Sequence, residues 1–205
     1  MPTVHMYTLE GLADWEPAFA LAFLRPNPYH KRPDGFRVVL VGETLAPTTS
    51  AGGLRLTPEL TLDALRPRDS ALLLLPGSDD WYRPAHDAAV AKAREFLGAG
   101  VPVAAICGAT FALARAGILD DRAHTSNGRA ELAPTGYAGA ARYVDAPAVT
   151  DRDLITASGI FPIDFARAIF ERLDAYRADI IDAWFRLYKH GDTKAFADIP
   201  PPGAS

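Results

Sequence analysis

The single cysteine of the chain, Cys107, lies where an apolar segment at residues 101–106 runs directly into a helix-like segment. Its neighbours are small: Ala105 stands two positions before it, and Gly108 and Ala109 follow it. A sharp strand-to-helix turn needs small neighbours, because the backbone passes close to itself there. Such a turn places the thiol at the carboxyl end of the strand and at a helix N-terminus, whose dipole favours a thiolate. The pattern therefore predicts a partly exposed nucleophile, with the Gly108 N–H aimed at a developing oxyanion.

The alternative interpretation is that Cys107 is a small buried residue, as free cysteines usually are. The strand–turn–helix context favours the functional interpretation. A lone cysteine forms no internal disulfide and no CxxC or cysteine-rich zinc motif, and it is typical of a reducing, cytoplasmic location. The five histidines include no HxxxH pair, so the sequence predicts neither a metal site nor a cofactor.

Short apolar segments alternate with helix-like segments along the chain, the pattern of an α/β protein with a mainly parallel central sheet flanked by helices. Strands are expected at residues 3–7, 36–42, 71–75 and 101–106. Helices are expected at residues 14–24, 84–97, 110–116, 162–173 and 177–189. The length predicts a single domain over residues 1–205, with a disordered or extended tail at 198–205.

Smaller features complete the expected organisation. Residues 44–57 are expected to form a loop or an edge hairpin that turns at Gly52 and Gly53. A short strand is expected at 123–126, and a strand pair at 143–149 and 154–157. Asp14 is a candidate N-cap for the first helix.

The composition argues against several classes of function. The net charge is −4 and no run of Lys and Arg contains interleaved aromatic residues, so no nucleic-acid partner is expected. No apolar run reaches the ~18 residues of a membrane span, and the first ten residues lack the pattern of a signal peptide. The expected partner is a small-molecule substrate.

Several segments, in order along the chain, resemble the ThiJ/PfpI superfamily of class I glutamine amidotransferase-like proteins. The family has a strand that ends in A-I-C, as residues 105–107 do, and an L-P-G-G turn, which here is L-P-G-S at residues 75–78. Residues 14–16, 124–127 and 154–159 match three further family segments. The resemblance covers about residues 3–175 and implies a flavodoxin-like three-layer sandwich that usually forms a homodimer.

The same resemblance implies roles for residues around Cys107. Glu16, at the start of the first helix, would hydrogen-bond the cysteine and carry its proton, and His124 would act as a helper base. The N–H groups of Gly77 and Gly108 would form the oxyanion hole. Each side chain also has an ordinary explanation, because a carboxylate such as Glu16 suits any helix N-terminus and His124 suits a polar surface loop.

The other expected pocket residues come from the same segments: Trp15, Ser78, Trp81 and Asn127. Aromatic side chains near a helix start more often pack than bind, so packing is the alternative for both tryptophans. Ser78 replaces the second glycine of the family's turn, and we expect it to change how a substrate lies over the oxyanion hole.

Departures from the family pattern narrow the expected function. Protease-like members have a histidine directly after the cysteine, where this chain has Gly108, and the His-x-Glu of glutaminases is not evident. The sequence therefore favours a small-molecule hydrolase or hydratase acting on a carbonyl, amide, imide or isonitrile carbon. The alternative is a non-enzymatic redox or stress-response protein in which Cys107 is an oxidation sensor. A binding module of flavodoxin-like shape is the third possibility.

Overall fold

Seven strands form one sheet at the centre of the computed structural model, which describes residues 1–199. Every neighbouring pair is parallel except the last, which is an antiparallel hairpin. Across the sheet the order is β5 (Leu60–Thr61), β2 (Arg37–Gly42), β1 (Thr3–Tyr7), β6 (Leu72–Leu75), β7 (Val103–Ile106), β9 (Leu154–Ala157) and β8 (Ala148–Asp151). The predicted α/β fold with a mainly parallel sheet is confirmed.

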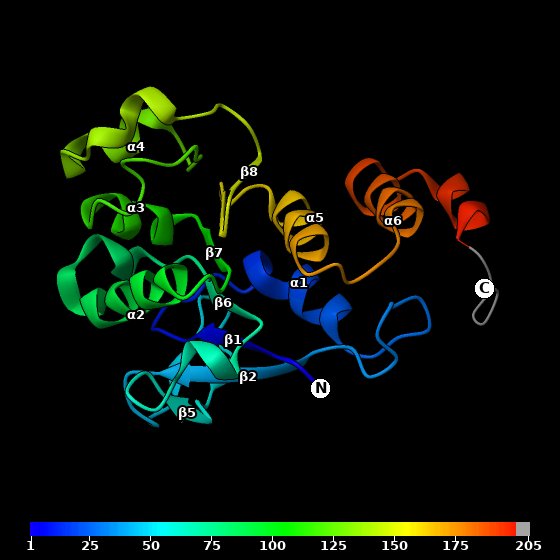
Figure 1. Ribbon diagram of the computed structural model, residues 1–205, viewed down its shortest axis with the longest axis horizontal. Helices are drawn as coiled ribbons and strands as arrows, with labels where there is room; N and C mark the ends of the chain where they lie inside the picture. Colours follow the sequence, from blue (N-terminus) through cyan, green and yellow to red (C-terminus); the bar gives the residue numbers. More distant parts are fainter. Residues whose placement is uncertain (200–205) are drawn as a thin grey trace.

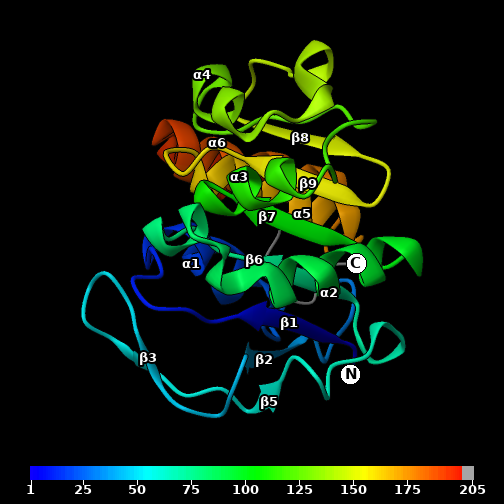
Figure 2. The same ribbon diagram turned by 90° about the vertical axis from the view of Figure 1, so that its left-hand side faces the viewer.

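Helices cover both faces of this sheet, which gives the three layers of a flavodoxin-like sandwich (Figure 1, Figure 2). One face carries α1 (Trp15–Leu24), α5 (Pro162–Arg172) and α6 (Ala178–His190). The other carries α2 (Asp87–Gly98) and α3 (Gly108–Arg115), and the short α4 (Arg129–Leu132) lies beyond α3. Among the described residues, no helix is long and apolar enough to cross a membrane.

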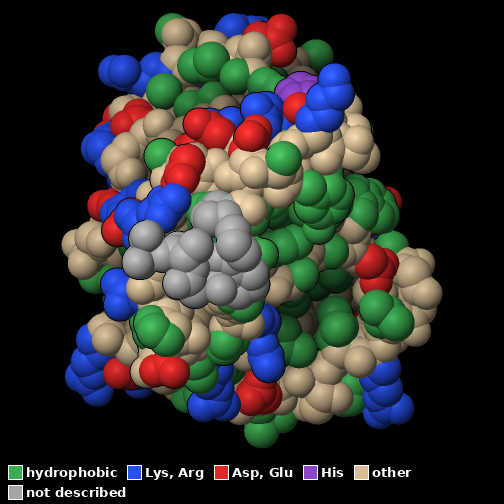
Figure 3. Space-filling model, turned by 90° about the vertical axis from the view of Figure 1, so that its right-hand side faces the viewer, with side chains coloured by type: hydrophobic (Ala, Val, Ile, Leu, Met, Phe, Trp, Pro, Cys, Tyr) green, Lys and Arg blue, Asp and Glu red, His purple; other side chains and the backbone are tan. Residues whose placement is uncertain are grey.

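Continuous apolar runs form the strands at the middle of the sheet. All four residues of β6 and of β7 are buried, as expected for strands with helices on both faces. On the side of α1, α5 and α6, aromatic rings fill the space between the helices. The Trp184 ring lies 5.5 Å from that of Phe23 and 5.0 Å from that of Phe170. Hydrophobic side chains also reach the surface on this side (Figure 3).

Short elements connect these layers. The predicted edge hairpin is present, with β3 antiparallel to β4 and Gly53 at a φ of 87° in its turn. The short segments are β3 (Thr48–Thr49), β4 (Arg55–Leu56) and the 3₁₀ turns η1 (Pro67–Asp69), η2 (Asp79–Tyr82), η3 (Pro84–His86), η4 (Ala133–Thr135), η5 (Ala138–Arg142) and η6 (Thr193–Asp198).

Two local predictions were wrong. Residues 123–126 form no strand, because pairing there is limited to one bridge between His124 and Tyr143. The strand expected at 143–149 begins only at Ala148, directly after Pro147, which has no N–H to donate to a ladder.

Two further predictions concern the start of the first helix and the C-terminal tail. Asp14 does not cap α1; its carboxylate accepts hydrogen bonds from the Ser50 hydroxyl (2.5 Å) and the Gly52 N–H (2.6 Å) of the hairpin. Of the tail expected to be disordered or extended, Asp198 ends the helical turn η6, and residues 200–205 lie outside the described part of the chain.

Candidate active site

Cys107 joins β7 to α3 on a strained turn. Its φ of 59° and ψ of −130° are unusual for a residue with a side chain. The turn is held from both sides, because the Cys107 N–H donates to the Ala157 carbonyl (3.0 Å) and its carbonyl accepts from the Thr110 N–H (2.9 Å). The predicted strand–turn–helix setting is therefore present, with the thiol partly exposed. Backbone strain of this kind is typical of functional positions.

Three glycines give the turn the space that it needs. A Cβ on Gly108 would lie 2.5 Å from the Ser78 carbonyl oxygen. On Gly77 it would lie 2.3 Å from Oε2 of Glu16, and on Gly159 it would lie 2.7 Å from Oε1 of Glu16 and 2.9 Å from the sulfur. None of the three positions has room for a side chain. The sulfur and the Glu16 carboxyl group are consequently packed against bare backbone.

Glu16 is the carboxyl group of the site, and it is fully buried. Its Oε2 accepts the Gly77 N–H at 2.6 Å. Its Oε1 has no hydrogen-bond partner of good geometry in residues 1–199 and faces the same side of Gly159 as the sulfur does. Burial raises the pKa of Glu16 from its ordinary 4.5 to about 7, against the opposing effects of the Cys107 thiol and the Gly77 N–H. Glu16 can therefore hold or release a proton near neutral pH.

The same buried surroundings change the pKa of the Cys107 thiol. Burial, followed by the charge of Glu16, raises the pKa of Cys107 to about 12, although donors at Asn127 and Gly108 favour the thiolate. The sequence pattern predicted that the helix N-terminus favours a thiolate. Desolvation outweighs that effect, so the helix N-terminus does not by itself produce a free thiolate. At neutral pH the thiol therefore keeps its proton, whereas Glu16 can gain or lose one, and the charge of each group affects the titration of the other.

Asn127 approaches the sulfur from the solvent side. Its Nδ2 donates to Cys107 Sγ at 3.2 Å, and its Oδ1 accepts the Gly159 N–H at 2.9 Å and the Ser158 hydroxyl at 3.3 Å. The sequence placed Asn127 in the pocket without a specific role. The structure makes it a direct partner of the sulfur.

His124 does not reach the sulfur. It is fully buried, its Nδ1 bonds the Arg122 carbonyl (2.8 Å) and its Nε2 bonds the Tyr137 hydroxyl (2.9 Å). Burial also lowers the pKa of His124, so the ring stays neutral. A base must lie within hydrogen-bond reach of its nucleophile, and both ring nitrogens are engaged elsewhere, so His124 is a core histidine here.

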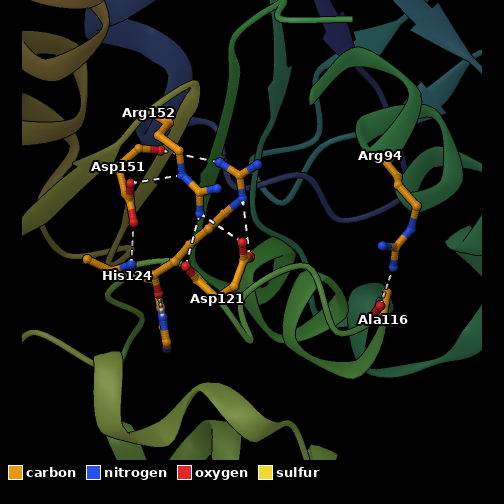
Figure 4. Close-up of polar contacts among 8 residues, drawn as sticks. Arg94, Ala116, Asp121, His124, Asp151 and Arg152 are labelled. Atoms are coloured by element: carbon orange, nitrogen blue, oxygen red, sulfur yellow. Dashed lines mark hydrogen bonds and ion pairs between the residues drawn. The ribbon is translucent and has the colours of Figure 1, made fainter. Parts of the chain in front are cut away.

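The segment that carries His124 is fixed by neighbouring charges. Asp151 accepts the Ala123 N–H at 2.6 Å and pairs with Arg152, which also pairs with Asp121 (Figure 4). This cluster anchors the chain just before residues 124–127. It helps to explain why His124 lies on the core side while Asn127, three residues later, lies beside the sulfur.

The other predicted pocket residues, Trp81, Ser78 and Trp15, differ in burial and in their hydrogen-bond partners. Trp81 is fully buried, with its indole N–H on the Pro76 carbonyl (2.7 Å), so it supports the turn and does not line a pocket. The Ser78 hydroxyl donates to the Glu10 carbonyl (2.6 Å). Trp15 is 55% exposed and donates its indole N–H to the Gly159 carbonyl (2.9 Å), which places it at the rim of the site.

The two predicted oxyanion donors also differ. The Gly108 N–H lowers the pKa of Cys107, so it lies near the sulfur, close to where a substrate oxyanion would develop. The Gly77 N–H is instead occupied by Glu16. Gly77 thus stabilises the carboxylate, and in this arrangement it is not free to bind an oxyanion.

Two residues of the site were missed by sequence reasoning. Glu131 accepts hydrogen bonds from the Tyr82 hydroxyl, the Ser126 hydroxyl (3.2 Å) and Asn127 Nδ2 (3.3 Å). Burial, and then the hydrogen bond to Glu131, raise the pKa of the Tyr82 phenol, which keeps it a donor. The available signal was the spacing of Asn127 and Glu131, four residues apart at the start of a helical turn.

A cavity of about 500 Å³ opens beside these groups. Its wall includes Asn127 and Ser158 together with the apolar side chains of Tyr143, Ile160 and Phe161. A separate apolar groove of about 280 Å³ lies between α1, α5 and α6, and no residue that lines it belongs to the site. A small molecule therefore has room on the Asn127 side of Cys107.

Comparison with known proteins gives consistent matches. The model of the DJ-1/PfpI family matches residues 2–172. The chain is 34% identical over 199 residues to the "Uncharacterized protease YoaZ" of Bacillus subtilis, covering 96% of this chain and 95% of that protein. A thiJ/pfpI family protein from Bacillus anthracis is 35% identical with a TM-score of 0.90, covering 96% and 94% of the two chains. The DJ-1 superfamily protein Atu0886 from Agrobacterium tumefaciens is 32% identical with a TM-score of 0.82, covering 93% and 99%.

Proposed function

Because the chain belongs to the DJ-1/PfpI family, we propose that it is a cysteine-dependent enzyme acting on small carbon electrophiles, with Cys107 as nucleophile and Glu16 as its proton partner. The observation that carries this proposal is the pairing itself. A strained, partly exposed thiol lies against a buried carboxyl group whose pKa is raised to about 7. Structural ion pairs do not need a group that titrates at the working pH, whereas acid–base catalysts do.

The first step is the attack of sulfur on a carbonyl, amide, imide or isonitrile carbon. The S–H proton passes to Glu16 Oε1 as Sγ forms its bond to carbon. With an isonitrile, that carbon becomes the anion and takes the proton back from Glu16. With a carbonyl, amide or imide, the π pair moves onto the oxygen. The Gly108 N–H stabilises that charge. With an amide, the C–N bond then breaks and the leaving nitrogen takes the proton from Glu16. Water attacks the resulting thioester, and the departing sulfur regains a proton.

The surroundings suggest which substrates suit this chemistry. Gly108 stands where protease-like relatives have histidine, and the Ser78 carbonyl leaves no room for a side chain there. A Cys-His pair between adjacent residues is therefore excluded, which favours small molecules over proteins. The cavity beside Asn127 would hold the rest of a small substrate. A homodimer, a cytoplasmic location and the absence of nucleic-acid or membrane partners remain predictions.

The test is turnover of methylglyoxal, an isonitrile and simple amides, followed by product analysis. We expect activity on at least one class that Cys107→Ala abolishes and Glu16→Gln lowers by about 100-fold or more. Glu59→Gln is the matched control, because its carboxylate pairs with Arg37 at the far edge of the sheet. Equal activity in Cys107→Ala and the wild-type protein would refute the proposal.

A redox sensor is the second candidate, favoured by one observation: the partly exposed sulfur faces the Asn127 Nδ2 and Gly108 N–H donors, which could bind sulfinate oxygens. Each of two peroxide molecules would transfer one oxygen to the sulfur and leave as water. Peroxide titration followed by intact mass would show a gain of about 32 Da, confined to Cys107. That gain without turnover of any substrate would favour the sensor over the enzyme.

A further inference from the structure

We propose that Glu131 is a positioning residue, which acts through Asn127 to hold an N–H donor on the Cys107 sulfur. The inference rests on the proposed role of Cys107 as nucleophile. Glu131 touches neither the sulfur nor the cavity that we assign to the substrate. Apart from the effect of its charge, its influence must therefore pass through the residues that it binds.

Glu131 is itself firmly held. The Tyr82 hydroxyl and Asn127 Nδ2 donate to Oε1, and the Ser126 hydroxyl lies within hydrogen-bond distance of Oε2. These donors come from different segments: Tyr82 ends η2, and the other two precede α4. The Tyr82 ring also packs on Phe111 of α3, with 4.8 Å between ring centroids. A carboxylate fixed by several donors is a rigid acceptor and not a mobile surface charge.

Asn127 needs such an acceptor because its amide has two possible orientations. In the observed one, Nδ2 lies between the sulfur and Glu131, while Oδ1 takes the Gly159 N–H. The flipped amide would set its oxygen against the Glu131 carboxylate and its NH₂ against the Gly159 N–H. An ionised carboxylate only accepts and a backbone N–H only donates, so together they select one orientation.

The contacts also form a closed ring around the nucleophile. Cys107 O accepts from Thr110 Oγ1 (2.6 Å), which lies 2.6 Å from Ser126 Oγ, and Ser126 contacts Glu131. Glu131 accepts from Asn127, which returns to Cys107 Sγ. The strained residue is thus bridged from its carbonyl to its sulfur by side chains. Removal of Glu131 opens this ring on the side of the sulfur.

Glu131 acts on the thiol in two opposite ways, which makes the inference testable. Its negative charge disfavours a thiolate, whereas the donor that it holds on the sulfur favours one. A role through charge alone predicts that Glu131→Ala and Glu131→Gln both lower the pH at which Cys107 reacts. A positioning role predicts that Glu131→Ala raises that pH, and that Glu131→Gln, which keeps an acceptor oxygen, stays closer to the wild-type protein.

The experiment measures the rate of iodoacetamide labelling of Cys107 against pH. We expect Glu131→Ala and Asn127→Ala each to raise the midpoint by about half to one pH unit, and to slow labelling at pH 7 by about three- to ten-fold. In the Asn127→Ala background, Glu131→Ala should raise the midpoint no further, because its intermediary is gone. Additive shifts, or a lower midpoint in Glu131→Ala, would overturn the inference.

Controls separate this inference from folding and from the proposed function. Glu59→Ala removes a distant surface carboxylate and should label like the wild-type protein. Should Glu131→Ala not fold, Glu131→Ser is measured in its place, because its shorter side chain cannot reach Asn127 and Tyr82 together. Labelling needs no substrate. If the single and double variants shift the labelling midpoint as expected but no substrate is turned over, the positioning role is upheld and the proposed enzymatic function is refuted. Turnover lost with Cys107→Ala, but an unchanged midpoint in the Glu131 variants, would do the reverse.

Discussion

The two sides of the Cys107 sulfur are built differently. On the inner side, Glu16 is fully buried, and Gly77 and Gly159 pack against its carboxyl group so tightly that neither could carry a Cβ. On the outer side, Asn127 is exposed and Glu131 half-buried, beside a cavity of about 500 Å³. In our proposal, the inner side holds the group that moves a proton, and the outer side holds neutral or anchored groups that adjust the reactivity of the sulfur.

One residue, Gly159, connects the two sides. The Gly159 N–H donates to Asn127 Oδ1 on the outer side, and its carbonyl accepts the indole N–H of Trp15, the residue before Glu16. The contrast suggests a division of effects. Changes on the inner side should alter both the stability of the protein and the reactivity of Cys107, because the groups there are packed without free space. Changes on the outer side should alter reactivity with little cost in stability.

The largest effect is expected for Glu16→Gln. The amide keeps the shape of the side chain but cannot take the thiol proton, so turnover should fall by about 100- to 1,000-fold. In the wild-type protein, burial and the charge of Glu16 raise the pKa of Cys107 to about 12, so labelling of Cys107 should rise only well above neutral pH. In Glu16→Gln the midpoint should move to a lower pH, because the charge that disfavours the thiolate is gone. An unchanged midpoint would mean that the thiol titrates independently of Glu16.

Glu16 should also leave a signature in stability against pH. Its pKa is raised in the folded protein from 4.5 to about 7, so between these values the folded state holds a proton that the unfolded chain has lost. The free energy of unfolding therefore decreases as pH rises through this window. Urea titrations from pH 4.5 to 7.5 should show this decrease in the wild-type protein and a weaker one in Glu16→Gln. Equal slopes would show that Glu16 titrates normally.

A smaller effect is expected for Gly159→Ala. The new methyl group would meet Glu16 Oε1 at 2.7 Å and Sγ at 2.9 Å, so it should destabilise the protein by about 1–3 kcal/mol and slow labelling about ten-fold. Gly98→Ala is the matched control, because a Cβ there meets nothing within 4 Å. It should be neutral or stabilise by up to about 1 kcal/mol. Similar stabilities for both variants would contradict the tight packing of the inner side.

His124→Phe tests whether His124 belongs to either side. Phenylalanine can keep the ring contacts with Tyr137 and Tyr143 but loses the hydrogen bonds to the Arg122 carbonyl and the Tyr137 hydroxyl. We expect a loss of about 1–2 kcal/mol in stability, measured by urea unfolding, with labelling and turnover unchanged. A shift of the labelling midpoint would return His124 to the site.

The sequence was informative where the determinants are local. An apolar run that ends in A-I-C-G-A specifies a strand, a turn with small neighbours and a helix, and the structure has all three around Cys107. The pairing of Glu16 with the sulfur came from the family resemblance and not from spacing, since the two residues lie ninety-one positions apart (107 − 16). Long-range packing brings them together, and no local pattern encodes it.

Sequence reasoning failed where two neighbouring side chains compete for one place. His124 and Asn127 are three residues apart, and either could have faced the sulfur. The bridge from His124 to Tyr143 and the hydrogen bond of His124 with Tyr137 turn the histidine into the core. The Gly77 N–H is a similar case, because its partner, an oxyanion or Glu16, depends on where α1 begins in space.

The smallest effect is expected for Trp15→Phe. The indole N–H donates to the Gly159 carbonyl at 2.9 Å, but the side chain is 55% exposed, so water can replace the lost donor. We expect a loss of at most about 1 kcal/mol in stability and less than about a three-fold change in the labelling rate of Cys107. The inner side would then keep its geometry without support from the rim, because packing against Glu16 and the sulfur already fixes Gly159. A ten-fold change in labelling would mean instead that Trp15 holds this peptide in place, and that the inner side depends on a contact at the surface.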